Sequence, residues 1–295
     1  MRINKTMGKI MIVFLLLLGL ALFVCWNNKS LVLTRYQYRS NQVPEQFDGF
    51  RITQISDLQS EYFGQYQKNL IAMAAETKPD IIVFTGDLLD RNHTDYEASR
   101  TAMEGLAKIA PVYYVNGNHE LALPEARTAE FYEELRAMGV TTLFDEKTAI
   151  KKGGQKINLI GLSEYTIYEG KDSDKRTETG FEPSVINDMI EKLTEGIAEE
   201  EMTIMLTHEP QFLDTYADDK VDLIFAGHAH GGQIRLPFTE GLFAPGQGVL
   251  PKLTSGMHQS GSTTMVISRG LGNSVFPFRF FNRPEVVVVD LKRGE

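Results

Sequence analysis

The segment Leu-Ile-Phe-Ala-Gly-His-Ala-His-Gly-Gly-Gln at 223–233 constrains the fold more than any other part of this chain. A short apolar run, typical of a buried strand, ends abruptly at two histidines that are separated by one residue and flanked by glycines. Imidazole is a common metal ligand, and a strand that ends in a flexible turn places both rings in one region. We therefore expect a metal site at the end of this strand, with further ligands supplied from elsewhere in the chain.

From residue 50 onward, short apolar runs alternate with segments of helical periodicity, which is the pattern of an α/β domain. Strands are expected at 51–56, 81–85, 112–115, 157–162, 202–207, 223–226, 264–268 and 285–291. Amphipathic helices are expected at 68–77, 96–109, 126–138 and 183–199, where apolar residues recur on one helical face. A charged insert bounded by glycines at 170–180 is predicted to be a solvated loop.

Five of the expected strands are followed directly by side chains that bind metals. These side chains are, in chain order, Asp57, Asp87, Asn118 with His119, His208, and His228 with His230. Taken singly, an aspartate after a strand usually caps a turn, and a single histidine is usually a structural residue. Ligand sites of α/β sheets lie at the carboxyl ends of strands, so the joint occurrence of all five blocks favours one shared site.

The candidate donors are carboxylates, an amide and imidazoles, without a thiolate. This set suits Mn, Fe or Zn, and a carboxylate shared between two ions would suit a dinuclear site. Two metal ions about 3.5–4 Å apart stabilise both the attacking and the leaving oxygen of an in-line displacement at phosphorus. The donor set therefore favours hydrolysis of a phosphoester.

The same blocks resemble the motifs of the calcineurin-like metallophosphoesterase superfamily. They read Asp57-x-Gln59, Gly86-Asp87-x-x-Asp90-Arg91, Gly117-Asn118-His119-Glu120, His208 and Gly227-His228-x-His230. Further segments, 268–272 and 282–285, are similar to the bacterial membrane-associated branch of YkuE type. The resemblance covers about residues 50 to 291, and it implies a four-layer α/β/β/α sandwich with a dinuclear site at its rim.

The resemblance also implies roles for individual residues. The implied ligands are Asp57, Gln59 and His230 for the first divalent ion, Asn118, His208 and His228 for the second, and Asp87 for both. A hydroxide that bridges the ions would attack the phosphorus in line, and His119 would protonate the leaving alkoxide. Asp90 would orient the ring of His119, with a simple turn role as the alternative.

Gln59 departs from the family pattern, because most members have histidine at this position. An amide oxygen is a weaker donor to Fe or Zn than an imidazole. We therefore expect a looser first site that favours Mn. The alternative, that the site has decayed, is opposed by the presence of every other ligand.

Contacts to substrate are expected in 233–283, which follows the last ligand and mixes turns with aromatic residues and arginines. An arginine binds a phosphate through two parallel hydrogen bonds, and a histidine in a loop can reach the site. An ordinary surface or structural role is the alternative for each candidate. The candidates are Arg235, His258, Arg269 and Arg279.

The N-terminal region contains an uncharged apolar run at 10–26, preceded by Arg2, Lys5 and Lys9. Its length is at the short end of what spans a bilayer, and it predicts a single-pass signal anchor, with a cleaved signal peptide as the alternative. The expected order is a cytoplasmic segment at 1–9, the span at 10–26, a tether at 27–49 and the catalytic domain at 50–295, outside the cytoplasm.

A formal net charge of -9 disfavours a broad electrostatic contact with nucleic acid. The sequence therefore predicts a membrane-anchored phosphohydrolase, and a phosphodiesterase in particular, whose substrate is a phosphoester of a lipid-linked or cell-envelope molecule. One alternative is a UDP-2,3-diacylglucosamine pyrophosphate hydrolase, which requires the domain to face the cytoplasm. An alternative from another class is a metal-stabilised scaffold without catalytic activity.

Overall fold

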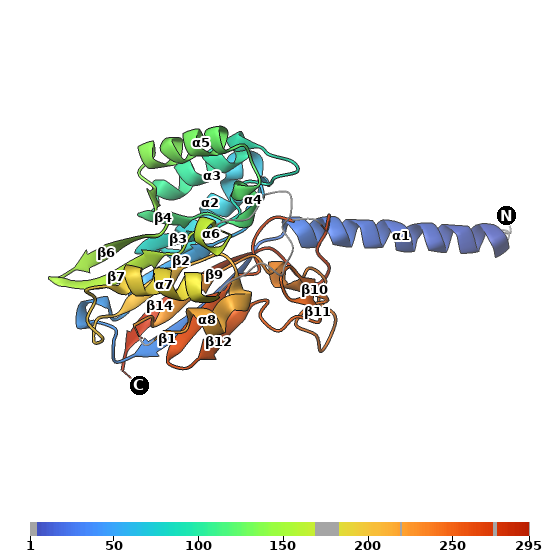
Figure 1. Cartoon of the computed structure of the whole chain (residues 1–295). Coiled ribbons are helices and arrows are strands. Elements are labelled where there is room, and N and C mark those ends of the chain that lie inside the picture. The colour runs from blue at the N-terminus through green and yellow to red at the C-terminus, as the bar shows by residue number, and fades with distance from the viewer. Residues whose placement is uncertain (1–4, 169–182, 219, 274–275, 295) are drawn as a thin grey trace.

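The computed structural model describes residues 5–168, 183–218, 220–273 and 276–294. The loop expected at 170–180 therefore lies outside the described residues. Two six-stranded sheets pack face to face, and helices cover their outer faces (Figure 1). This architecture confirms the expected four-layer α/β/β/α sandwich.

The first sheet has the strand order β1-β14-β2-β3-β4-β5. Strands β2 to β5 run parallel to one another, whereas β14 is antiparallel to β2 and parallel to β1. The carboxyl ends of β2, β3 and β4 therefore lie at the same edge of the sheet. The strands are β1 (Val32–Ser40), β2 (Arg51–Ile55), β3 (Ile81–Thr85), β4 (Val112–Val115), β5 (Thr141–Thr142) and β14 (Glu285–Arg293).

The second sheet has the order β12-β13-β9-β8-β7-β6. Its four central strands are parallel, and β6 and β12 are antiparallel strands at the two edges. A separate hairpin is formed by β10 (Phe243–Ala244) and β11 (Gly248–Val249). The sheet strands are β6 (Glu146–Lys152), β7 (Gln155–Gly161), β8 (Thr203–Leu206), β9 (Leu223–Ala226), β12 (Gly256–Ser260) and β13 (Thr263–Ile267).

The helices bury the outer faces of the two sheets. Helices α2 (Lys68–Thr77), α3 (Tyr96–Ala107) and α5 (Glu125–Ala137) cover the first sheet, and α7 (Pro183–Thr194) and α8 (Leu213–Tyr216) cover the second. On β3, Val83 faces the other sheet and Phe84 faces the helices, and both side chains are fully buried. A parallel strand that is buried on both faces reads as a continuous apolar run, which explains why the sequence predicts it.

All of the expected strands and helices are present, with ends that differ by a few residues. The largest difference at a helix end is in α7, which ends at Thr194 instead of 199 because Gly196 follows with a φ of +77°. The sequence did not predict the short helices α4 (Asn118–Leu121) and α6 (Glu164–Ile167). It also did not predict the edge strands β6 and β12, which lack a continuous apolar run.

The expected tether at 27–49 differs most from the structure. Helix α1 (Lys5–Lys29) extends through its first residues, and β1 pairs over nine residues with β14. Tyr38 of β1, together with Val43 and Phe47, packs into the core between the sheets. Polar side chains alternate along β1, so this edge strand does not stand out in the sequence. The folded domain therefore begins directly after α1.

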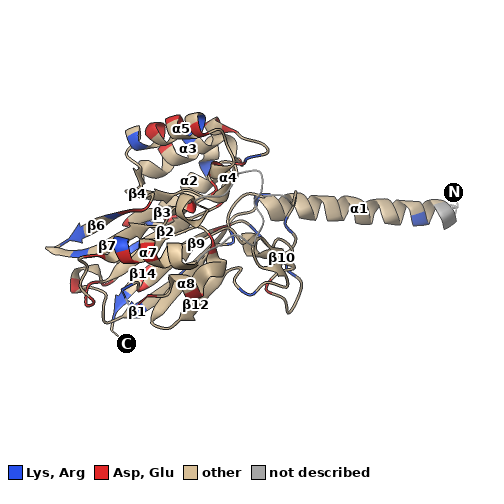
Figure 2. Ribbon diagram, in the orientation of Figure 1, with Lys and Arg blue, Asp and Glu red and all other residues tan. Residues whose placement is uncertain are grey.

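Helix α1 projects away from the domain (Figure 1). Its Met7–Lys29 part is long and apolar enough to cross a membrane, by length and composition. Figure 2 shows this helix without charged side chains over most of its length.

Candidate metal centre

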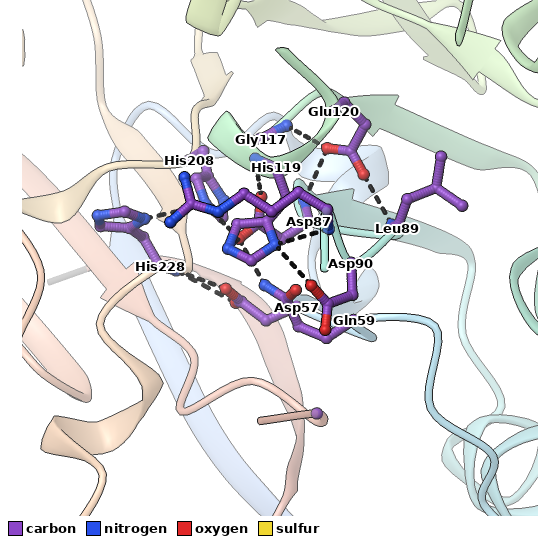
Figure 3. A network of polar contacts seen from close by, with 12 residues as sticks. Asp57, Gln59, Asp87, Leu89, Asp90, Gly117, His119, Glu120, His208 and His228 are labelled. Carbon is purple, nitrogen blue, oxygen red and sulfur yellow. Dashed lines mark hydrogen bonds and ion pairs between the residues drawn. The ribbon is translucent and has the colours of Figure 1, made fainter. Parts of the chain in front are cut away.

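The ends of strands from both sheets meet at one edge of the sandwich. Two groups of donor atoms lie there, each with its atoms within 4.8 Å of one another. One group is formed by Asp87, His208 and His228, and the other by Asp57, Asp87 and His230. Figure 3 shows side chains of this cluster converging from separate elements. Asp87 belongs to both groups, as a carboxylate that bridges two ions would.

In the group that contains His208, one ring nitrogen is committed to the backbone. Its Nδ1 lies 2.8 Å from the carbonyl oxygen of Thr85, to which it donates. Its Nε2 lies 3.3 Å from Oδ2 of Asp87 and 3.2 Å from Nδ1 of His228. A ring nitrogen that donates to a carbonyl fixes the tautomer and leaves the lone pair of the other nitrogen for a metal.

The other group is organised around Asp57. Its carboxylate oxygens lie 3.0 and 3.1 Å from the backbone N of His228, and Oδ1 lies 3.6 Å from Nε2 of His230. Nε2 of Gln59 donates to Oδ2 of Asp87 at 2.6 Å, whereas Oε1 of Gln59 is buried without a hydrogen-bond partner among the described residues. A buried amide oxygen without a hydrogen-bond partner is available as a metal ligand. The side chains of the two groups therefore fit a pair of divalent ions.

The backbone at the candidate ligands is strained. A left-handed conformation is uncommon for residues other than glycine, and such conformations cluster at functional sites. At Gly227, a Cβ atom would lie 1.9 Å from Oγ of Ser56 and 2.4 Å from Oδ2 of Asp57, so only glycine permits this close approach. The left-handed ligands, with their φ angles, are Asp57 (52°), Gln59 (52°), Asp87 (52°), His228 (65°) and His230 (46°).

His119 lies at the edge of the ligand cluster. Its backbone N donates to Oδ1 of Asp87 at 2.9 Å, and its ring Nε2 lies 3.9 Å from Oδ2 of the same residue. The other ring nitrogen, Nδ1, lies 3.4 Å from Oδ1 of Asp90. Burial lowers the pKa of His119, but Asp87 and the hydrogen bond with Asp90 outweigh it and raise the pKa overall. Asn118, the first residue of α4, directly precedes His119.

Burial and neighbouring charges set the pKa values of the candidate ligands. Against burial, the interaction between Asp87 and His208 lowers the pKa of Asp87 and raises that of His208. Burial raises the pKa of Asp57 to about 6, against His208, which lowers it. Burial, with a contribution from His208, lowers the pKa of His228 to about 3. Burial and then the guanidinium of Arg279 lower the pKa of His230 well below its usual range. Because a neutral imidazole is the form that binds a metal, His228 and His230 need not lose a proton first.

The predicted substrate contacts are all engaged within the protein, and one of them, Arg279, lies 3.2 Å from Nδ1 of the candidate ligand His230. Arg279 is fully buried, and its guanidinium donates to the carbonyl oxygens of Gly272, Arg269 and His230 at 2.6, 2.7 and 3.3 Å. Carbonyl oxygens thus accept from Nη1 and Nη2 of Arg279, whereas its Nε has no hydrogen-bond partner among the described residues, and a bidentate contact of Arg279 with phosphate stays a prediction.

The other three candidates also have partners within the protein. Arg235 pairs with Glu240 at 2.8 Å, and Arg269 pairs with Glu285 at 2.7 Å. Nε2 of His258 lies 3.0 Å from the carbonyl oxygen of Ser255.

Glu120 supports the site, and the sequence did not assign it a role. Its Oε2 accepts hydrogen bonds from the backbone N of Gly117 (2.7 Å) and Asp87 (3.1 Å), and its Oε1 accepts one from Leu89 (2.7 Å). One buried carboxylate thus fixes the loop that carries Asp87 (Figure 3). The sequence feature that could have identified Glu120 is its position directly after Asn118 and His119.

Asn282 is a second supporting residue to which the sequence analysis assigned no role. Its Nδ2 donates to the carbonyl oxygens of His230 (2.7 Å) and Gln233 (3.1 Å), so it holds the turn that carries His230. The sequence contains no local signal for this contact, because the partners are about fifty residues apart.

A helix-covered double sheet, with overlapping carboxylate and imidazole groups at its edge, defines a metal-dependent phosphoester hydrolase. The profile of the calcineurin-like phosphoesterase family matches residues 50–232, and the chain belongs to this family.

Two bacterial relatives match over most of their length. The uncharacterized metallophosphoesterase YkuE of Bacillus subtilis is 32% identical over 270 residues, which cover 88% of this chain and 85% of YkuE. The phosphodiesterase YaeI of Escherichia coli is 26% identical over 258 residues, which cover 86% of this chain and 84% of YaeI. These relatives confirm the predicted YkuE-type branch.

More distant proteins share the domain or the fold. A transmembrane protein with a metallophosphoesterase domain from Danio rerio is 25% identical over 268 residues, covering 86% of this chain and 55% of that protein. Among solved structures, the sulfate thiohydrolase SoxB of Thermus thermophilus has a TM-score of 0.50 at 11% identity, covering 83% of this chain and 56% of SoxB. The similarity to SoxB concerns the fold alone.

Proposed function

We propose that this protein is a membrane-anchored phosphodiesterase with two divalent metal ions, Mn being favoured. The observation that carries the proposal is the pair of donor groups that share Asp87. When bound, such ions supply Lewis acidity to the phosphoryl group and activate water. The proposed ligands are Asp57, Gln59, Asp87 and His230 for one ion, and Asp87, Asn118, His208 and His228 for the other.

His119 acts as the general acid in this proposal. Its Nε2 faces the ligand cluster at Asp87, and Asp90 lies against its Nδ1 at 3.4 Å. Asp90 therefore orients the ring so that Nε2 delivers its proton to the leaving oxygen. A proton donor is needed most when the leaving group is an alkoxide, because an alkoxide is a strong base.

The preference for a diester is supported by the charges around the site. Arg235 and Arg269 are paired with carboxylates, and Arg279 donates to carbonyl oxygens. Arg91 is exposed and follows Asp90 directly, and its backbone N donates to Nδ1 of His119 at 3.3 Å, so it lies beside the site. An exposed arginine beside the candidate ligands can bind the single negative charge of a phosphodiester. The relative YaeI is a phosphodiesterase, which agrees with this choice.

The proposed location is the cell membrane, with α1 as a single span and the catalytic domain outside the cytoplasm. The support is the length and composition of Met7–Lys29. A UDP-2,3-diacylglucosamine pyrophosphate hydrolase would need the opposite orientation. A topology reporter fused to the C-terminus separates the two, because a cytoplasmic C-terminus would favour the pyrophosphate hydrolase.

Turnover of bis-p-nitrophenyl phosphate by the full-length protein with added Mn tests the proposal. We expect His119→Ala to lower turnover by about 10²-fold or more, with the metal content retained. Tyr66→Ala is the control, since this aromatic side chain is 72% exposed and lies outside the donor groups. If the parent protein has no turnover although it holds metal, the scaffold alternative is favoured.

A further inference from the structure

The end of helix α1 is packed firmly against the domain. The ring centroid of Phe23 lies 5.5 Å from that of Phe280 and 5.2 Å from that of Phe281. Five residues later, Asn28 donates through Nδ2 to the carbonyl oxygen of Arg279 at 3.1 Å and accepts from the backbone N of Arg279 at 2.7 Å. The direction of α1 is therefore fixed relative to the domain.

This packing sets the depth of the adjoining loop relative to the apolar helix. Phe23 lies within the apolar run at 10–26, and at 1.5 Å per residue it is about 5 Å from Trp26 along the helix axis. Trp26 lies 5.1 Å from the guanidinium of Arg283, and tryptophan is typical of the boundary between membrane and water. Phe280 and Phe281 therefore lie at the level where the apolar helix ends.

The exposed aliphatic and phenylalanine side chains of the domain come from one stretch of the sequence. Outside α1, every exposed large aliphatic or phenylalanine side chain of the described residues falls within 236–281. Phe238 is 107% exposed and Val249 is 76% exposed. We call this group the interfacial face, and its members are Leu236, Phe238, Phe243, Val249, Leu250, Phe276 and Phe281. Scattered apolar side chains are normal on a surface, but a confined group marks an interaction site.

The fold places the interfacial face beside the base of α1. Figure 1 shows the β10–β11 hairpin, which carries Phe243 and Val249, next to the domain end of this helix. The loop with Phe280 is joined to the same region, because Ile234 and Phe280 form a β-bridge and Arg235 N donates to the carbonyl oxygen of Phe280 at 3.0 Å.

The interfacial face also adjoins the metal donors. His230 begins the short helical turn that ends at Gly232, and Ile234 follows two residues later. Asn282 follows Phe281 directly and donates to the carbonyl oxygen of His230 at 2.7 Å. The exposed apolar side chains thus lie on segments that directly adjoin His230 or the residue that holds its turn, Asn282.

We propose that the interfacial face inserts into the headgroup layer of the bilayer that α1 spans, and that the site takes its phosphodiester from an amphiphile in that layer. The substrate part rests on the proposed phosphodiesterase function. The lipid bilayer is the occupant that fits, because the face is continuous with a helix of membrane-spanning length and lies at the level of its end.

Insertion is tested with the full-length protein in phosphatidylcholine vesicles, independently of catalysis. Trp26 is the sole tryptophan, so Phe238→Trp in a Trp26→Phe background gives one fluorophore on the interfacial face. Lys151→Trp in the same background is the matched control, since this exposed residue lies on β6, at the end of the domain away from α1. We expect brominated phosphatidylcholine to quench the Phe238→Trp protein and not the Lys151→Trp protein. Equal quenching of the two, or none at either, overturns the proposal.

The substrate class is tested with two esters that share one reacting group, hexadecyl p-nitrophenyl phosphate in the vesicles and methyl p-nitrophenyl phosphate in the buffer. We expect the triple variant Phe238→Ser, Val249→Ser, Leu250→Ser to lose about tenfold in turnover of the hexadecyl ester and nothing on the methyl ester. An equal loss on both esters, or no loss on either, contradicts the substrate proposal. If the parent hydrolyses neither ester, the proposed function fails, while the quenching experiment still decides insertion.

Discussion

The guanidinium of Arg279 lies 3.2 Å from Nδ1 of His230, a proposed ligand. The backbone of Arg279 is bonded in turn to Asn28 in the last turn of α1. A single buried arginine thus connects the base of the apolar helix to the metal donors.

We expect Arg279→Lys to weaken metal binding by about 10 to 100-fold, because groups that orient a ligand typically contribute this much. Lysine keeps the charge but cannot reach several carbonyls and the ring of His230 together. Mn titration of the metal-free protein measures the change. The control is Arg293→Lys, whose guanidinium also donates to carbonyl oxygens, those of Asn41 and Val43. Equal affinities in the parent and Arg279→Lys would contradict the role of Arg279.

Gln59→His should change which metal the protein prefers. The amide of Gln59 lies against Asp87, and an imidazole there is a stronger donor to Fe or Zn than an amide oxygen. We expect more Fe or Zn in the purified protein and less dependence of turnover on added Mn. Elemental analysis and metal-dependent assays measure both, with Gln65→His at an exposed position as the control. Unchanged metal content and Mn dependence would remove the basis for a loose first site.

Asp222→Asn should alter the pH dependence of stability. Burial raises the pKa of Asp222, although its Oδ2 accepts a hydrogen bond from the backbone N of Thr203 at 2.8 Å. A carboxyl whose pKa is raised on folding binds more protons in the native state, so its contribution to stability is lost as pH rises through the folded pKa. Asparagine keeps an acceptor for Thr203 and does not ionise. Relative to the parent, the Tm of the variant should therefore rise between pH 4 and pH 7; a constant difference would contradict this.

Removal of β1 should destabilise the domain. A fragment that begins at Val43 loses the nine-residue pairing with β14 and the buried ring of Tyr38, whereas one that begins at Ser30 keeps both. Burial of one such side chain contributes about 1.5–3 kcal/mol, so we expect at least this loss in the free energy of unfolding. Urea denaturation of the two fragments measures it. Equal midpoints and slopes would show that β1 adds nothing to the fold.

The sequence predicted the parts of the fold that position the candidate ligands. Strands β3 and β9 are fully buried, so they read as uninterrupted apolar runs, and the polar residues that follow them stand out. The overlap of the two donor groups at Asp87 could not be read from spacing alone, because it depends on how the two sheets pack. The family resemblance supplied that expectation.

The sequence analysis missed the features in which polar or charged residues belong to the folded core or to a sheet. β1 mixes Arg35, Gln37 and Arg39 with apolar residues, because an edge strand has partly exposed side chains. Arg279 was predicted as a candidate substrate contact, since an arginine held by carbonyl oxygens inside the protein looks the same in the sequence as an exposed one. Both cases required the long-range contacts of the folded chain.

Only Ser30 and Leu31 separate the last residue of α1 from the first residue of β1. If α1 spans a bilayer as proposed, so short a connection would prevent the domain from moving away from the membrane surface. The domain would then meet a membrane-borne substrate by lateral diffusion in two dimensions.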